Sequence, residues 1–151
     1  MRRCSFVKLC SCIAILLLFN GCRKESPPPI VPAKGIVLLG GKPLPTAQVR
    51  FIPQIGFGAD YIATATTDDQ GRFTLQCNGQ QGACAVDNMV TVNEPDIPPQ
   101  LQGENAQREL AVYLRSLKNR PIPRNYASLA STPLRVTVAE GQEEYKLELN
   151  R

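Results

Sequence analysis

Cysteine is the residue type with the most chemistry to offer in this chain, because the 151 residues include six cysteines and no histidine. Without histidine, Ser–His and Cys–His nucleophile pairs cannot be built, and most catalytic zinc sites lose a principal ligand. The adjacent carboxylates Asp68–Asp69 and Glu143–Glu144 fall in expected exposed turns, where water solvates them. We therefore expect a protein that is not an enzyme, with no catalytic residue, no cofactor and no metal.

Cys22 is the cysteine with the clearest role. It follows Gly21 at the end of an apolar run that begins after the basic residues Arg2 and Arg3, an arrangement typical of a lipoprotein signal. In such a signal, residues 1–21 are removed, and Cys22 becomes the first residue of the mature chain and carries a thioether-linked diacylglycerol. We therefore expect lipidation at Cys22, with acyl chains such as palmitate anchoring the protein in a membrane.

An uncleaved membrane helix is the alternative for this first segment. The apolar stretch from Cys10 to Phe19 is much shorter than the roughly 20 residues that a membrane-spanning helix needs. Cys4, Cys10 and Cys12 lie inside the removed segment and should take no part in the mature protein. The basic residues of the signal also explain most of the net charge of +4, so the remainder is nearly neutral and gives no support for a nucleic-acid partner.

A proline-rich segment follows the lipidated cysteine. Four prolines within residues 23–32 fix the backbone φ angle and remove amide donors, which favours the extended polyproline II conformation. We assign residues 22–33 as the lipidated cysteine and a tether. At about 3.1 Å per residue, the tether would hold a domain up to roughly 30 Å from the bilayer. A ligand for a proline-recognition domain is the alternative interpretation.

From Lys34 onward, apolar and polar residues alternate with a period of two, which is typical of strands that bury one face. Turn residues separate seven such segments, at 36–39, 47–51, 62–66, 72–76, 86–92, 134–138 and 145–149. Between the fifth and sixth, residues 103–118 show the apolar spacing of a helix. We expect an all-β fold, a sandwich of about seven strands over residues 34–150, with one helical insertion before the last two strands.

Two interpretations of the helical insertion remain open. In the one we favour, a stripe of Leu110, Leu114 and Leu117 turns inward and caps one open end of the sandwich, since such a stripe more often belongs to a core than to an interface. In the other, the same three leucines form a partner-binding surface held away from the membrane. The stability of a Leu114→Ala variant would distinguish between them.

Besides Cys22, the mature chain keeps an even pair of cysteines in an exported, oxidising setting. Cys77 and Cys84 both have the parity of inward-facing residues, and the stretch between them is short and contains glycine. A hairpin would place the two residues opposite each other, near the lower end of disulfide geometry. We expect a Cys77–Cys84 disulfide, with two free buried thiols as the alternative.

Two other groups of residues suggest a calcium site and an isopeptide bond, but neither group fits the chemistry well. Asp60, Asp68 and Asp69 offer carboxylates at a spacing that matches no calcium loop, so a role in turns is favoured. Lys34 and Asn150, near the first and last strands, suggest the self-made isopeptide bond of an adhesin-type sandwich. Asn150 has the outward parity of its strand, however, whereas that reaction needs both groups buried together.

The order of these segments resembles a known domain. The run from Gly35 to Phe51, the turn from Thr67 to Phe73 and the later segment from Ile122 to Gly141 are similar to the carboxypeptidase-regulatory-like domain, including its form in small bacterial lipoproteins. The resemblance covers most of residues 34–150 and implies a prealbumin-like (transthyretin-like) sandwich. In carboxypeptidases this domain is an accessory unit, and members of the wider group that hydrolyse 5-hydroxyisourate depend on histidines, which this chain lacks.

Together, the residues and the resemblance predict a lipid-anchored, non-enzymatic binding or structural accessory module of the cell envelope. Its partners would be the membrane and an envelope protein or glycan. Arg23 is not the Asp that retains lipoproteins at the inner membrane of well-studied Gram-negative envelopes, so we expect the outer membrane. The alternatives are a transthyretin-like carrier of a small ligand, which would need a dimer interface or an apolar cavity, and a self-cross-linking adhesin-type module.

Overall fold

Strands make up most of the regular structure in the computed structural model, which describes residues 26–54, 56 and 58–151. The predicted signal segment 1–21 and Cys22 lie outside these residues. Within the described ranges, no helix combines the length and the apolar character needed to cross a membrane.

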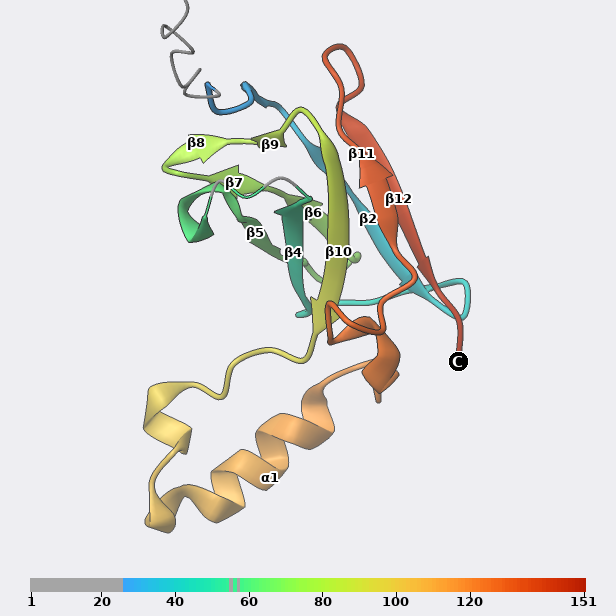
Figure 1. The fold of residues 1–151 in the computed structure, drawn as a ribbon. Coiled ribbons are helices and arrows are strands. Elements are labelled where there is room, and N and C mark those ends of the chain that lie inside the picture. The colour runs from blue at the N-terminus through green and yellow to red at the C-terminus, as the bar shows by residue number, and fades with distance from the viewer. Residues whose placement is uncertain (1–25, 55, 57) are drawn as a thin grey trace, which may run out of the picture.

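The strands form two main sheets that pack face to face (Figure 1). The larger sheet has the order β11-β10-β4-β5-β7-β8, and the smaller has the order β12-β2-β3, with β6 also paired to β2. The strands of these two sheets are β2 Lys34–Leu39, β3 Lys42–Pro43, β4 Gln48–Pro53, β5 Ala63–Thr66, β6 Arg72–Thr74, β7 Gln76–Cys77, β8 Gln80–Gln81, β10 Asp87–Asn93, β11 Arg135–Thr137 and β12 Glu144–Leu149.

Alternation in the sequence becomes alternation in burial, which confirms a β-rich sandwich. The number of strands differs from the prediction of about seven, because the described residues form twelve strands, several of them short. In β12, Tyr145, Leu147 and Leu149 are buried, and the residues between them are exposed. This strand runs parallel to β2, with Lys34 opposite Glu144 at one end of the ladder. Each of the seven predicted strand segments overlaps at least one observed strand.

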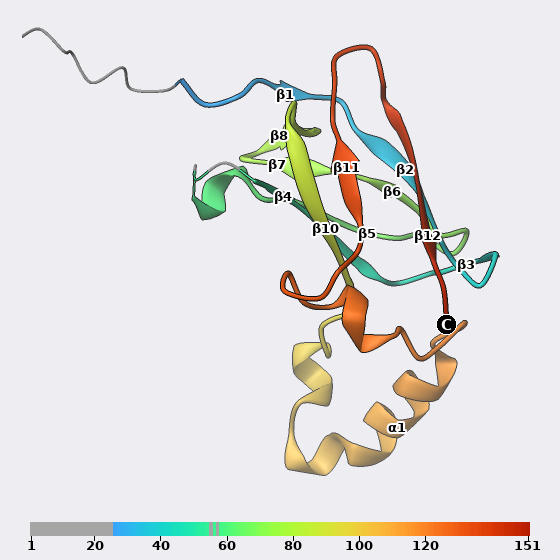
Figure 2. The same cartoon turned by 45° about the vertical axis from the view of Figure 1, so that its right-hand side comes forward.

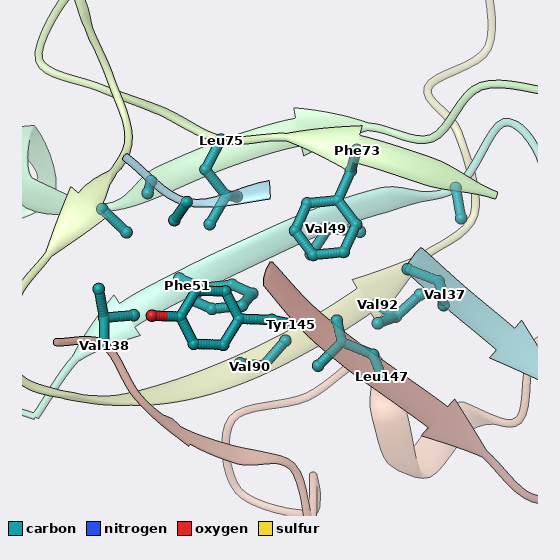
Figure 3. Close-up of a cluster of buried hydrophobic side chains, with 14 of the residues drawn as sticks. Val37, Val49, Phe51, Phe73, Leu75, Val90, Val92, Val138, Tyr145 and Leu147 are labelled. Carbon is teal, nitrogen blue, oxygen red and sulfur yellow. The ribbon is translucent and has the colours of Figure 1, made fainter. Parts of the chain in front are cut away.

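Aromatic rings join the two sheets at the centre of the core (Figure 3). Phe51 of β4 lies 6.1 Å from Phe73 of β6 and 6.2 Å from Tyr145 of β12, measured between ring centroids. Aliphatic side chains from both sheets surround the rings and are fully or almost fully buried: Val37, Val49, Leu75, Val90, Val92, Val138 and Leu147. Burial of this apolar surface is the main force that holds the sheets together.

The predicted strand 72–76 is divided between the two sheets. β6 pairs with β2 in the smaller sheet, whereas β7 pairs with β5 in the larger one. Leu75 lies between them, and its amide donates a hydrogen bond to the carbonyl of Ala33 at 2.9 Å. One continuous segment therefore crosses from sheet to sheet and closes that side of the sandwich.

The sandwich begins earlier than the sequence predicted, inside the segment assigned to the tether. β1, Ile30–Val31, pairs antiparallel with β9, Ala83–Cys84, and places Ile30 opposite Cys84. Val31 and Ala33 are buried in the core. The predicted boundary of 22–33 was therefore wrong at its end, because the β-branched residues between the prolines complete a strand pair.

The helical insertion lies at the opposite end of the sandwich from β1 (Figure 2). It confirms the helix predicted for residues 103–118, as a 3-10 turn, η3, followed by the α-helix α1. The helical elements of the described chain are η1 Ala59–Tyr61, η2 Pro99–Leu101, η3 Glu104–Ala106, α1 Gln107–Ser116 and η4 Arg124–Tyr126. The first part of the insertion leaves β10, and the chain returns through η4 to β11.

Candidate functional site

A polar clasp fastens the base of the insertion, which we define as residues 95–119. Nε of Arg120 lies 2.5 Å from Oε2 of Glu94, so an ion pair joins the residues that flank the insertion. Nη2 of Arg120 donates to the carbonyls of Pro45 and Thr46, each at 2.9 Å. Oε1 of Glu94 accepts the amide of Ile122 at 3.0 Å. Both ends of the insertion are therefore tied to each other and to the loop before β4.

Asn119 adds a second set of contacts at the same base. Its φ is +57°, and its side-chain amide points Nδ2 at the carbonyls of Leu39, Lys42 and Pro43 at 3.1 to 3.2 Å. Nη2 of Arg151 donates to Oδ1 of Asn119 at 2.7 Å. The turn between β2 and β3 and the end of the chain are thus held against the base of the insertion.

The tip of the insertion stands away from the sandwich (Figures 1 and 2). No residue of α1 is buried, and α1 packs against η2 and η3 of its own loop. Leu110 and Leu117 are half-buried, but the side chain of Leu114 is 50% exposed. Our preferred interpretation of Leu110, Leu114 and Leu117 as a cap on the core was therefore wrong.

A different segment closes the end of the sandwich and explains why α1 does not. Ile122 and Tyr126, from the return segment that contains η4, are both buried in the core cluster. The hydroxyl of Tyr126 also accepts the amide of Asn150 at 2.9 Å, which ties η4 to the end of β12. The spacing of four residues between Ile122 and Tyr126 is compatible with one buried helical face, but two residues are too few to show a period.

The outward face of α1 combines apolar and basic side chains. Helical geometry places Arg108, Ala111, Val112 and Arg115 on one face, and all four are exposed, Val112 at 62%. Within the part of the chain that the structure describes, neither arginine forms an ion pair. The tip therefore presents an apolar centre between two uncompensated guanidinium groups.

Cys77 and Cys84 lie at the other end of the sandwich, near β1. The hairpin between them is tighter than predicted: Asn78 and Gly79, both with positive φ, form its turn and place Cys77 opposite Gln80. The prediction that Cys84 sits opposite Cys77 in this hairpin was wrong. The Asn-Gly pair, a strong signal for a two-residue hairpin turn, would have given the correct register.

Both cysteines are buried free thiols in this structure, so the predicted disulfide is not formed in it. Sγ of Cys77 lies 3.8 Å from the carbonyl of Asp60, and Sγ of Cys84 lies 3.6 Å from that of Tyr61. The two thiols also interact with each other. Burial raises the pKa of Cys77, and burial together with the neighbouring Cys77 raises the pKa of Cys84 to about 11.

We expect a Cys77–Cys84 disulfide to form wherever the protein meets oxidants, because the two thiols already interact with each other. Peptide mapping without reduction should recover both residues in one cross-linked species. The reduced protein should lose stability as the pH rises from about 9 towards 11, because the unfolded thiol ionises near 9.0 while the folded Cys84 stays protonated to about 11. Quantitative alkylation of both thiols in denatured, unreduced protein from the envelope would refute the disulfide.

Lys34 and Asn150 are too far apart to form an isopeptide bond. Lys34 pairs with Glu144 at the start of the parallel ladder, and Asn150 follows the end of β12. Six residues along a strand span about 20 Å at about 3.3 Å per residue. Nζ of Lys34 lies instead 3.5 Å from Oε1 of Glu144. Cross-linking between these two residues is therefore excluded.

Asp68 stabilises the turn in which it lies, as the sequence predicted. Its Oδ1 accepts the amides of Gln70 and Arg72, each at 2.8 Å, and its Oδ2 forms an ion pair with Arg72. The hydrogen bond from the Arg72 amide is the main cause that lowers the pKa of Asp68. Asp60 belongs to η1, elsewhere in the chain.

No protein-family model, no curated protein and no solved structure matches this chain.

Proposed function

We propose that this protein is a lipid-anchored, non-enzymatic module of the cell envelope that binds a partner through the tip of its insertion. The observation that carries the proposal is the position of α1. The chain enters the sandwich at β1, eight residues after Cys22, and α1 lies at the opposite end with exposed apolar residues (Figure 2). An anchor at Cys22 would leave α1 as the part of the domain farthest from the bilayer.

The chemistry of the tip suggests what the partner offers. Ala111 and Val112 supply apolar contact area, and Arg108 and Arg115 on the same face supply donors for carboxylates. The best complement is a groove on an envelope protein, with an apolar floor and acidic residues at its rim, that receives the helix face. A glycan is the alternative class of partner. Arg23 after the lipidated cysteine supports the outer membrane as the location.

We further propose that the sandwich is of the carboxypeptidase-regulatory-like, prealbumin-like kind. Support comes from the two-sheet arrangement, from the seven predicted strand segments and from the resemblance of the turn at Thr67 to Phe73. In carboxypeptidases the domain of that kind accompanies a catalytic unit rather than acting as one. An accessory role also agrees with a sequence that contains no histidine.

Replacing Cys22 with Ala should release the protein from the membrane fraction. Without the thiol no diacylglycerol can be attached, so the chain should accumulate as unprocessed precursor or as soluble protein. Fractionation and intact mass of wild type and variant measure both effects, and Cys12→Ala is the matched control because Cys12 lies within the removed segment. Wild-type mature protein that stays membrane-bound with no acyl mass on Cys22 would defeat the proposal.

Replacing Leu114 with Ala should change the free energy of unfolding by no more than about 0.5 kcal/mol, because its side chain is half exposed. Leu147→Ala, at a buried leucine, is the matched control and should cost about 2 to 5 kcal/mol. Cross-links from a photoreactive residue at Ala111 to an envelope protein should weaken when Val112, on the same face of α1, is changed to Asp. Strong destabilisation by Leu114→Ala, or cross-links that persist unchanged, would contradict the proposed role of the tip.

A small-ligand carrier remains the second candidate because of one groove of about 700 Å³ on the smaller sheet. Apolar and charged side chains line it, among them Ile36, Phe73, Tyr145, Lys34, Arg72 and Glu144. Its volume suits a small molecule, but ion pairs such as Arg72–Asp68 lie at the groove and make it partly polar. Native mass spectrometry that detects a co-purified small molecule, lost when Ile36 is changed to Asp, would favour the carrier.

A further inference from the structure

A track of polar side chains crosses the outer face of the larger sheet, beside the base of the insertion. It includes no residue of α1. It consists of two adjoining hollows of about 460 and 680 Å³ that share Gln48, Arg50 and Asp96. The first two side chains come from β4, and Asp96 comes from the segment that leads into the insertion. The shared residues make the two hollows one continuous track.

The polar side chains of the track are arranged in register across four strands. Thr91 of β10 lies opposite Arg50 of β4, Arg50 opposite Thr64 of β5, and Thr64 opposite Gln76 of β7. Neighbouring strands lie about 4.8 Å apart, so this row extends over about 14 Å. That length suits an oligomer that lies across the strands better than a single small molecule.

Hydrogen bonds hold the central side chains in place and leave part of their capacity free. Nη2 of Arg50 donates to Oε1 of Gln48 at 3.4 Å, and Nε2 of Gln48 donates to Oδ2 of Asp96 at 2.5 Å. Within the described residues, Arg50 has no carboxylate partner. The guanidinium keeps most of its donors for a ligand, and the carboxylate of Asp96 keeps lone pairs that can accept hydroxyl or amide hydrogens.

An apolar wall faces these polar groups in the larger hollow. Ile52, Ile62, Ala127 and Leu129 line it, and Leu129 is 45% exposed. The last two come from the segment after η4, so the return segment completes a wall that Ile52 and Ile62 begin. A ligand that fills the hollow must therefore combine hydrogen-bonding groups with small apolar groups.

We propose that this track binds an oligosaccharide of N-acetylated amino sugars. Sugar hydroxyls and acetamide N–H groups match Asp96, Gln48 and Arg50, while acetamide methyls and ring C–H faces match the wall of Ile52 and Leu129. The site is independent of α1 and goes beyond the proposed binding at the tip of the insertion.

Two other classes of ligand fit the track less well. An extended peptide usually docks on a free strand edge, but β4 and β5 are each paired on both sides. A nucleic acid would meet the carboxylates of Glu94 and Asp96, which line the larger hollow and repel phosphates. The amino-sugar oligomer is the ligand whose chemistry matches both the polar side chains of the track and its apolar wall.

The test uses the full-length protein in detergent micelles and two probes, a β-linked hexamer of N-acetylglucosamine and the glucose hexamer cellohexaose. Saturation-transfer NMR should show contact at the acetamide methyls, and calorimetry should give a Kd for cellohexaose at least about tenfold higher. Asp96→Asn and Arg50→Gln should each weaken binding of the acetylated hexamer about tenfold or more, as expected when a charge-assisted hydrogen bond is lost.

Asp69→Asn, an exposed acid in a turn outside the track, is the matched control and should bind like wild type. Thermal unfolding of every variant checks that the sandwich is intact. The proposal is overturned by an absence of saturation transfer at millimolar hexamer, by equal affinity for cellohexaose, or by binding that neither Asp96→Asn nor Arg50→Gln alters. A peptide that occupies the track while the sugar does not would overturn it as well.

Discussion

Gly35→Ala should strongly destabilise the sandwich. A Cβ atom at Gly35 would lie 1.9 Å from the carbonyl oxygen of Tyr145 and 2.8 Å from Cζ of Phe73, both far inside van der Waals contact. The carbonyl belongs to the backbone of β12, directly opposite Gly35 in the parallel ladder, so it cannot move without breaking strand pairing. We expect a loss of more than about 4 kcal/mol, a large part of the about 5 to 15 kcal/mol that stabilises a typical domain.

Urea unfolding followed by circular dichroism measures the effect, and Gly103→Ala is the matched control. Gly103 has an ordinary φ of −79°, and no atom lies within 4 Å of the position that its Cβ would take. Alanine there should change stability by no more than about 1 kcal/mol, and in the stabilising direction. If Gly35→Ala and Gly103→Ala unfold at similar urea concentrations, β2 and β12 are not as close as described.

Arg120→Ala should release the insertion from the sandwich. The change removes the ion pair with Glu94 and leaves the carbonyls of Pro45 and Thr46 without their donor. The side chain of Arg120 is only 12% exposed, but that of Glu94 is 47% exposed and can be solvated in compensation. We therefore expect a loss of about 2 to 3 kcal/mol, below the usual cost of breaking a fully buried pair.

Hydrogen exchange locates this loss, because the amide of Ile122, held by Glu94, should exchange much faster in Arg120→Ala. Arg115→Ala is the matched control, since Arg115 is an exposed arginine on α1 and should change stability by no more than about 0.5 kcal/mol. Arg120→Lys should fall between the two, because lysine keeps the charge without the planar fork. Equal stability of the Arg120→Ala and Arg115→Ala proteins would show that the clasp contributes nothing.

The strands were predictable from the sequence because their signal is local. Alternation in residues 145–149 states which side chains share a face, and the observed burial of β12 follows it residue by residue. The same reasoning located α1 to within a few residues of its ends. What a face packs against is a different question, because it depends on residues far away in the sequence.

Apart from the register of the hairpin after Cys77, which the local pair Asn78 and Gly79 indicates, the errors concern such distant contacts. Leu110, Leu114 and Leu117 were correctly identified as an apolar stripe. The stripe does not cap the sandwich, because Tyr126 of η4 is buried at that end instead. The short strand at Ile30–Val31 is defined by its pairing with β9, because two residues carry no period. Leu75 continues the alternation of its neighbours, so the local sequence pattern does not indicate that the chain changes sheets there.

The pairing of β1 with β9 also determines how the domain would respond to a pull on residues 26–29, which is where force would arrive if Cys22 carries the proposed lipid anchor. Force applied through the tether meets first a ladder of two residue pairs, and only then the six-residue ladder between β2 and β12. The short ladder should open first, because few hydrogen bonds and two small buried side chains, Val31 and Ala33, resist it. Residues 30–33 would then add about 13 Å of reach at about 3.3 Å per residue, while the sandwich behind them stays folded. A domain tethered through this segment would therefore lengthen under load by unpairing β1, and it would shorten again when the load is removed.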